Sequence, residues 1–206
     1  MARDPLRSAV VNPYPLLYRL GITPWEREQP PTPVVELGER YPSPGRALDI
    51  GCGTGRDAVY LAERGWTVTG VDSVAQALDR ARERAAHAGV EVRWVNGDVT
   101  RLQTLEIGGD YELLIDRGCF HGLGDDERER CVRGVTEVAA PGARLALFAF
   151  QPRRLGLGPR GVTSEEITRR FGAEWDLASR TLDVESRPPR WVGDAKPMWY
   201  ELQRRG

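Results

Sequence analysis

The stretch LDIGCGTGRD, residues 48–57, places three glycines at alternate positions between an apolar run and a helical pattern. Glycine in such a turn lets the backbone approach a ligand closely where a strand leads into a helix. The dinucleotide fingerprint GxGxxG would need a third glycine where Arg56 stands, so Gly51, Gly53 and Gly55 form GxGxG instead. The loop therefore predicts a nucleotide-like ligand and disfavours NAD.

Asp49 adds a charge to this loop, because it precedes Gly51 by two residues at the end of the expected buried strand. A pyrophosphate ~4 Å from that carboxylate would be repelled by about 4 kcal/mol at an effective dielectric near 20. S-adenosylmethionine carries an ammonium and a sulfonium and has no phosphate, so the same carboxylate attracts it. We therefore predict S-adenosylmethionine as cofactor and S-adenosylhomocysteine as product. An NAD-binding oxidoreductase and a cofactor-binding protein without turnover are the remote alternatives.

Strand and helix patterns alternate from residue 46 onwards. Expected strands cover 46–50, 66–72, 90–95, 111–116 and 143–150, and expected helices cover 57–64, 73–88, 125–139 and 163–171. Ser73 with Gln76, and Thr163 with Glu166, have capping-box spacing. The segments WDLASRTLDV and MWYELQR can pair as a terminal hairpin. This alternation predicts an α/β fold, a Rossmann-like doubly wound sheet of seven mostly parallel strands with an antiparallel C-terminal hairpin.

We expect one domain over residues 1–206, with a proline-rich arm or lid at 1–45 and the Rossmann-like core at 46–206. Ligands of such sheets bind beyond the carboxyl ends of the strands. Two further acids lie at expected strand ends. Asp72 is placed to accept hydrogen bonds from the ribose hydroxyls, with helix capping as the alternative role. Asp98 is placed to accept a hydrogen bond from the adenine amino group, with a simple role in a turn as the alternative.

Composition excludes several functional classes. The net charge of -1 disfavours nucleic acid as a partner, and no apolar run approaches the ~18 residues of a membrane helix. The three cysteines (Cys52, Cys119 and Cys131) and two histidines (His87 and His121) give no metal-binding spacing. An odd, low cysteine count fits a reducing compartment, so we expect a cytoplasmic monomer or homodimer that acts on a small molecule.

Three stretches resemble the motifs of class I S-adenosylmethionine-dependent methyltransferases: ALDIGCGTGRDAVYLA, VTGVDS and VNGDV. Within that family, TPWEREQP (23–30), LAERGWTVTGVDSV (61–74) and LLIDRG (113–118) resemble the thiopurine and tellurite-resistance branch. The resemblance covers roughly residues 20–150. One departure is that thiopurine enzymes have Leu-Cys-Gly where this chain has Gly51, Cys52 and Gly53.

The resemblance implies a role for each matching residue. Trp25 would cover the cofactor, and the remaining cofactor contacts would be Asp49, Gly51, Cys52, Gly53, Gly55, Asp72, Ser73, Asp98 and Val99. The Asp-Arg-Gly motif places Asp116 and Arg117 beside the sulfonium and the substrate as the catalytic pair. No metal is expected.

The branch implies S-methylation of a (hetero)aromatic thiol by in-line displacement, with O-methylation of a small phenol or carboxylate as the alternative. A thiol of pKa about 8.5 needs no dedicated base, because a few per cent is already thiolate at neutral pH. Arg117 would favour the thiolate or orient a substrate anion, unless it forms a salt bridge with Asp116 or another acid. Cys119 and His121 are not expected to form a nucleophile and base. Aromatic pocket candidates are Tyr14, Tyr18, Trp25, Phe120 and Trp191.

Overall fold

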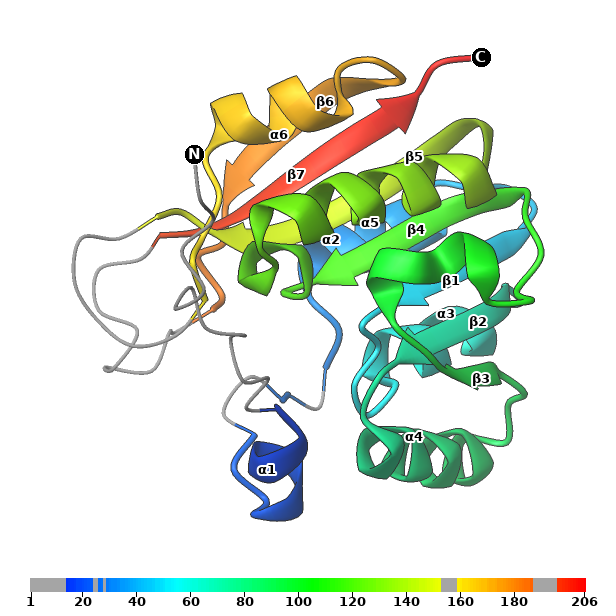
Figure 1. The fold of residues 1–206 in the computed structure, drawn as a ribbon. Helices are drawn as coiled ribbons and strands as arrows, with labels where there is room; N and C mark the ends of the chain where they lie inside the picture. Colours follow the sequence, from blue (N-terminus) through cyan, green and yellow to red (C-terminus); the bar gives the residue numbers. More distant parts are fainter. Residues whose placement is uncertain (1–13, 24–25, 28, 153–158, 187–195) are drawn as a thin grey trace.

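Figure 1 shows the fold of the computed structural model, which describes residues 14–23, 26–27, 29–152, 159–186 and 196–206. The predicted pocket residues Trp25 and Trp191 lie outside these ranges. Within them, no helix is both long enough and apolar enough to cross a bilayer.

Seven strands form one sheet in the order β3-β2-β1-β4-β5-β7-β6. Their bounds are β1 Arg46–Ile50, β2 Thr67–Asp72, β3 Arg93–Asn96, β4 Tyr111–Arg117, β5 Ala139–Phe150, β6 Trp175–Leu182 and β7 Pro197–Arg204. The first five run parallel, whereas β7 lies antiparallel to both β5 and β6. The predicted fold class, including the antiparallel C-terminal hairpin, is confirmed.

Helices cover both faces of the sheet (Figure 1), and most residues of its central strands are buried and apolar. One face packs against η1 (Val99–Thr104), α5 (Asp125–Val138) and α6 (Ser164–Phe171). The other packs against α2 (Thr32–Glu39) and α3 (Arg56–Glu63), with α4 (Ala75–Ala88) beside α3. All the parallel strands therefore end at one edge, where the predicted site residues gather.

The two predicted helix caps had different outcomes. Thr163 caps α6, because its Oγ1 accepts the Glu166 N–H at 3.1 Å. The Ser73 cap is wrong: α4 begins after Val74, which makes no side-chain cap. Asp72 Oδ1 accepts the Val74 N–H at 2.8 Å instead, so this carboxylate takes over the polar role expected of the serine.

The N-terminal arm is divided by its packing. Helix α2 buries Val34 and Leu37 against the sheet, and the Trp66 indole donates to Gly38 O at 3.3 Å. This half of the arm therefore belongs to the core. The short helix α1 (Tyr14–Arg19) lies apart, against α4, and a covering role for the arm stays a prediction.

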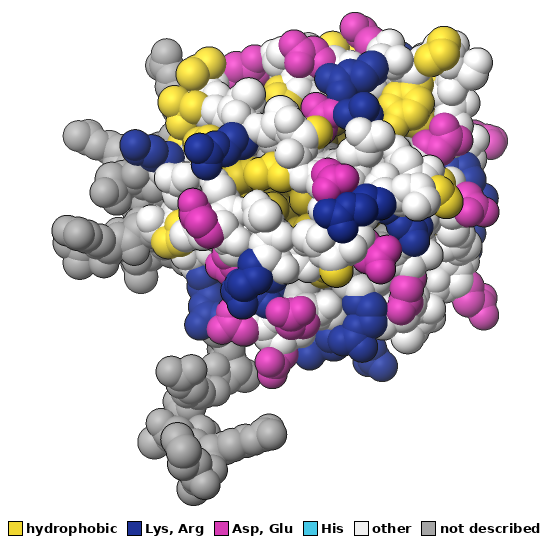
Figure 2. All heavy atoms as spheres, turned by 90° about the horizontal axis from the view of Figure 1, so that it is seen from above, with side chains coloured by type: hydrophobic (Ala, Val, Ile, Leu, Met, Phe, Trp, Pro, Cys, Tyr) yellow, Lys and Arg dark blue, Asp and Glu magenta, His cyan; other side chains and the backbone are white. Residues whose placement is uncertain are grey.

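The surface carries both signs of charge in close mixture. On the face shown in Figure 2, Lys and Arg side chains alternate with Asp and Glu, in agreement with the net charge of -1. That view shows no continuous field of one sign.

Candidate active site

The glycine loop joins β1 to α3 through three left-handed residues. Gly51, Gly53 and Gly55 have φ values of 70°, 54° and 74°, which residues with a side chain rarely adopt. The N–H groups of Gly51 and Cys52 donate to Val71 O at 2.8 and 3.0 Å. The Gly53 N–H donates to Asp72 Oδ2 at 2.8 Å. These three donors are bound within the protein, so the loop does not present them to a pyrophosphate.

Two of the glycines allow close approaches that a side chain would block. A Cβ at Gly51 would lie 2.8 Å from Cys119 Cβ, and one at Gly53 would lie 2.7 Å from the Tyr18 hydroxyl. Tyr18 belongs to α1, is 5% exposed, and packs against Val74 and Ala77 at the start of α4. The N-terminal arm thus reaches the glycine loop through Tyr18, which the sequence marked only as one of several pocket aromatics.

Asp49 is a buried carboxylate without full compensation. Its side chain is 2% exposed, and Oδ2 has no hydrogen-bond partner. Burial raises the pKa of Asp49 well above its ordinary value, and the neighbouring Asp57 adds to the rise. A buried acceptor left unpaired in this way is costly unless a ligand satisfies it. An ammonium group is the type of ligand that fits such a position.

A buried ion group lies beside Asp49. Asp57, in the first turn of α3, accepts from Arg56 Nε and Nη2 at 2.7 and 2.9 Å and from Arg117 Nε at 2.8 Å. Arg56 and Asp57 are 6% and 3% exposed, whereas the Arg117 side chain is 24% exposed. Of the alternatives for Arg117, a salt bridge with an acid other than Asp116 is therefore present. The Arg117 side chain nevertheless stays partly exposed.

The remaining predicted cofactor residues lie at the ends of β2 and β3. Asp98 is exposed and its Oδ1 accepts the Thr100 N–H at 2.8 Å, which starts η1. Val99 packs in the core, so only its backbone can face a ligand. Ser73 is exposed beside Asp72. The parallel register β1-β2-β3 brings these residues to one edge, next to the glycine loop.

Asp116 is held by backbone donors at the end of β4. Its Oδ1 accepts the Cys119 and Phe120 N–H groups at 2.8 and 3.2 Å, and these bonds shape the turn that leads into η2 (Phe120–Gly122). Burial raises the pKa of Asp116 to about 7, although these hydrogen bonds oppose the rise. Asp116 thus positions the loop that follows Arg117, and a direct catalytic role for it stays a prediction.

The raised pKa of Asp116 predicts a pH dependence of stability. Between its ordinary value of 3.8 and about 7, the folded state holds a proton that the unfolded state has released, so stability falls as pH rises. Asp116→Asn keeps an oxygen for both N–H groups but cannot titrate. We expect the stability of the variant relative to the parent to rise by about 4 kcal/mol from pH 4 to pH 8, at ~1.4 kcal/mol per pKa unit. Urea unfolding at several pH values measures this, and a pH-independent difference would contradict it.

The cysteines near the site are not activated. Burial raises the pKa of the thiols of Cys52 and Cys119 well above the ordinary value, and nearby carboxylates add to the effect. Thiolates are therefore disfavoured, in line with the expectation that Cys119 is not a nucleophile. His121 is 3% exposed, and its Nδ1 accepts the Phe150 N–H at 3.0 Å. A neutral His121 ring consequently carries its proton on Nε2.

Aromatic rings gather at the carboxyl ends of β4 and β5. His121 stacks on Phe150 with centroids 5.2 Å apart and an interplanar angle of 19°. Phe148 meets Phe150 at 5.4 Å and Trp199 at 5.3 Å. The strand register aligns Arg117 with Phe148 and Phe148 with Trp199, so this aromatic cluster (His121, Phe148, Phe150 and Trp199) lies beside Arg117. Sequence reasoning missed it, because its members come from three separate segments, η2, β5 and β7.

Comparison with known proteins identifies the family. The model of a family described as a methyltransferase domain matches residues 47–142. The 2-heptyl-1-hydroxyquinolin-4(1H)-one methyltransferase of Mycobacteroides abscessus is 30% identical over 158 residues, which cover 75% of this chain and 69% of that protein. The chain belongs to the class I S-adenosylmethionine-dependent methyltransferases. It is therefore an enzyme, and S-adenosylmethionine is its cofactor.

Solved methyltransferases share the fold of this one. The 1,6-didemethyltoxoflavin-N1-methyltransferase of Burkholderia thailandensis, solved with 1,6-didemethyltoxoflavin and S-adenosylhomocysteine, has a TM-score of 0.76 at 21% identity, with 100% of this chain and 94% of that chain covered. TehB of Haemophilus influenzae has a TM-score of 0.71 at 18% identity, with 84% and 62% covered. At 18–21% identity, both matches show the shared fold.

The residues of this methyltransferase fit the cofactor. The unpartnered Asp49 oxygen suits its ammonium, and the glycines leave room for close approach without offering donors meant for phosphate. When bound, the cofactor supplies an electrophilic methyl group. The protein's own residues would hold its ends, exclude water and present the acceptor.

Asp72 provides a direct test of cofactor binding. Its carboxylate already accepts backbone N–H groups of the loop and of α4, and each oxygen has a further lone pair for a ribose hydroxyl. We expect Asp72→Ala to weaken S-adenosylhomocysteine binding by ~1.5–3 kcal/mol through loss of charge-assisted hydrogen bonds. Calorimetric titration measures it. An unchanged dissociation constant in a folded variant would leave Asp72 with the capping role only.

Proposed function

We propose that this methyltransferase acts on a small, planar heteroaromatic acceptor, and that a thiol is the acceptor group it methylates best. The observation that carries the proposal is the aromatic cluster beside Arg117 at the carboxyl edge of the sheet. Phe150 is the partly exposed member of this mostly buried cluster. A flat apolar ring suits a site lined in this way, whereas a flexible amine or a macromolecule gains little from it.

The acid–base groups near the cluster favour an acceptor that ionises by itself. The two oxygens of Asp116 are occupied by backbone N–H groups, and the Nδ1 of His121 accepts another. A heteroaromatic thiol has an appreciable thiolate fraction near neutral pH, so it depends little on a protein base. The Arg117 guanidinium, at the end of β4, favours that anion.

A hydroxyl acceptor is the second candidate. The relative from Mycobacteroides abscessus is named for a 1-hydroxyquinolin-4(1H)-one, a planar hydroxylated heterocycle. An acidic heteroaromatic hydroxyl would meet the same requirement, since it also ionises without a base. Both candidates share the flat ring and differ in the nucleophilic atom.

In-line transfer requires the nucleophile, the methyl carbon and the sulfur to be held in a row. Such positioning supplies ~7–11 kcal/mol of a displacement barrier. We propose that Asp49, Asp72 and the glycine loop fix the cofactor, while Arg117 and the aromatic cluster fix the acceptor ring. Tyr18 and the arm before α2 would close over the loop and exclude water from the reacting atoms.

A substrate panel tests the proposal. The enzyme is supplied with S-adenosylmethionine and with heteroaromatic thiols, their hydroxyl counterparts of the same ring, and aliphatic amines, and release of S-adenosylhomocysteine is measured. We expect turnover to rank thiol above hydroxyl above amine. Turnover of hydroxyl compounds alone would support the second candidate, and a preference for amines without rings would overturn the proposal.

Arg117 is expected to act on the acceptor more than on the cofactor. We predict that Arg117→Gln lowers kcat/KM for a thiol by roughly 10- to 100-fold, about 1.4–2.7 kcal/mol. The acidic limb of the pH profile should move to higher pH, because the positive charge that favours the thiolate is gone. S-adenosylhomocysteine affinity should change less. An unmoved acidic limb would reduce Arg117 to a structural partner of Asp57.

A further inference from the structure

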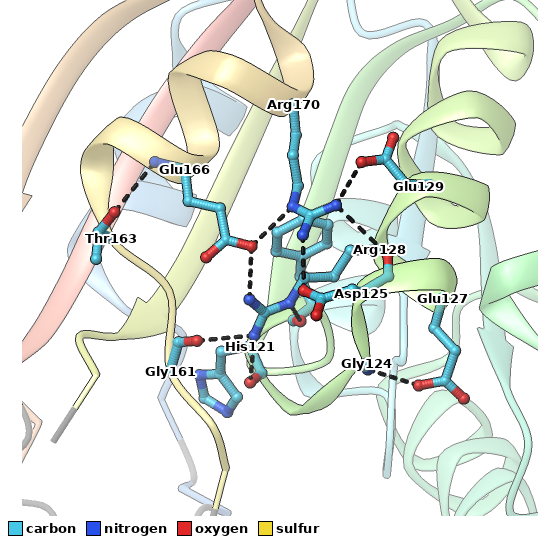
Figure 3. Close-up of polar contacts among 11 residues, drawn as sticks. His121, Gly124, Asp125, Glu127, Arg128, Glu129, Gly161, Thr163, Glu166 and Arg170 are labelled. Atoms are coloured by element: carbon cyan, nitrogen blue, oxygen red, sulfur yellow. Dashed lines mark hydrogen bonds and ion pairs between the residues drawn. The ribbon is translucent and has the colours of Figure 1, made fainter. Parts of the chain in front are cut away.

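Arg128 is a buried arginine whose side chain joins two loops at the carboxyl edge of the sheet (Figure 3). It lies in the first turns of α5 and is 4% exposed. Its guanidinium donates to Phe120 O at 3.3 Å, to His121 O at 3.0 Å and to Gly161 O at 2.7 Å. Its Nη1 pairs with Glu166 Oε1 at 2.9 Å. One side chain therefore ties the turn after β4 to the segment between β5 and α6.

Those loops hold the ring of His121 in place. The His121 carbonyl accepts from Arg128 and also from the Gly161 N–H at 3.1 Å. Its Nδ1 accepts the Phe150 N–H, and Val162 N–H donates back to Phe150 O at 2.9 Å. Backbone and ring are thus fixed together, and His121 stacks on Phe150 within the aromatic cluster.

Glycine at position 161 makes the connection possible. Gly161 has φ of 78°, and an added Cβ would lie 2.7 Å from the backbone of Gln151. The chain passes so close to the end of β5 that only a glycine fits, and this brings the Gly161 carbonyl to Arg128. The contact between Arg128 and Gly161 thus depends on the close approach of Gly161 to the end of β5, and not on helix packing in general.

The ion pairs around Glu166 have an inner half, the pair with buried Arg128, and an outer half, the pairs of Arg170 with Asp125 and Glu129. Glu166 also pairs with Arg170 Nε at 2.7 Å, and Arg170 reaches Asp125 and Glu129 at the surface (Figure 3). The side chains of Asp125 and Glu129 are 75% and 58% exposed, so solvent screens the outer half. Arg128 donates to three backbone carbonyls as well as to Glu166, and the surface ion pairs of Arg170 cannot replace these bonds.

We infer that Arg128 is a positioning residue for the methyl acceptor: through His121 it holds the aromatic cluster and fixes the Nε2-protonated form of that ring. The inference rests on the proposed function, because it assumes that the acceptor ring lies on this cluster. It assigns no proton transfer to His121. Cofactor binding, at the ends of β1 and β2, should be independent of Arg128.

Histidine NMR reports on this role without any acceptor. The chain has two histidines, and the Nδ1 of exposed His87 lies 2.7 Å from Glu83 O, so a neutral His87 ring donates from Nδ1. The two rings should therefore show opposite tautomers in nitrogen-15 spectra. In Arg128→Lys, which keeps the charge but loses the planar fork, the His121 signals should move toward a tautomer mixture while those of His87 stay.

Kinetics with the best acceptor of the panel complete the test. We expect Arg128→Lys to raise the acceptor KM and lower kcat/KM by roughly 10- to 50-fold, with S-adenosylhomocysteine affinity within about threefold. Glu129→Gln, in the outer half, is the matched control and should change neither quantity. Unchanged acceptor kinetics together with an unchanged His121 tautomer would overturn the inference, and so would equal losses of acceptor and cofactor affinity.

If no planar acceptor is turned over, the proposed function fails, but the tautomer and cofactor measurements still decide whether Arg128 fixes His121. If Arg128→Lys does not fold, Glu166→Gln removes only the ionic partner and should produce the same changes to a smaller degree.

Discussion

Asp49→Asn is expected to weaken S-adenosylhomocysteine binding by about 100-fold or more and to stabilise the ligand-free protein. The buried Asp49 oxygen without a partner is costly in the free enzyme and favourable only when a cation approaches it. Removing one partner of a buried charge pair costs ~2–5 kcal/mol of binding. Replacing the unpaired Asp49 carboxyl group by a neutral amide should stabilise the ligand-free protein by ~1–3 kcal/mol.

Two measurements on the same variant check this. Calorimetric titration gives the affinity, and urea unfolding of the free protein gives the stability. 5′-Methylthioadenosine, which has the adenosine and the sulfur but no ammonium, is the control ligand and should bind parent and variant equally. An equal loss for both ligands would mean that Asp49 shapes the loop and does not recognise the ammonium.

Most elements of the fold could be predicted from local patterns. The apolar runs before Gly51 and Ser73 and the periodicity of residues 125–139 gave elements whose bounds agree within a few residues. The third strand was the weakest, predicted at 90–95 and found at Arg93–Asn96, because an edge strand lacks the full apolar run of a buried one. The Ser73 cap was wrong because α4 begins one residue later than expected, after Val74, and Asp72, two residues before Val74, accepts the Val74 N–H.

The candidate site could be predicted only in part. Residues at strand ends followed from topology, since parallel strands bring their carboxyl ends to one edge. Contacts between distant segments did not follow. Asp57 and Arg117 are 60 positions apart, and Arg56 seemed to be only the residue that replaces a glycine. Side-chain pairing over such separations depends on three-dimensional packing, for which one sequence holds no direct signal.

Asp57→Ala is expected to be among the most destabilising substitutions in this chain. It would take from Arg56 and Arg117 the carboxylate to which both donate, and would leave Asp49 as the acid beside them. Breaking a buried pair by removing one member costs ~3–5 kcal/mol. Asp57→Asn keeps an acceptor oxygen and should cost less. Urea unfolding measures both, and Asp79→Asn, in the exposed pair with Arg82, is a control expected to cost under ~1 kcal/mol.

The same ion group predicts a reversal of sign in a double-mutant cycle. Burial is the main cause of the raised pKa of Asp49; Asp57 adds to the rise, whereas Arg117 and Arg56 oppose it. In the Asp57→Asn background, Asp49 becomes the carboxylate that faces two arginines, so its own pKa should fall and its charge should become favourable. Asp49→Asn, stabilising in the parent, should therefore be destabilising there. Unfolding of the parent, both single variants and the double variant gives the coupling energy, expected at ~1–3 kcal/mol. Additive effects would show that Asp49 and Asp57 do not share these arginines.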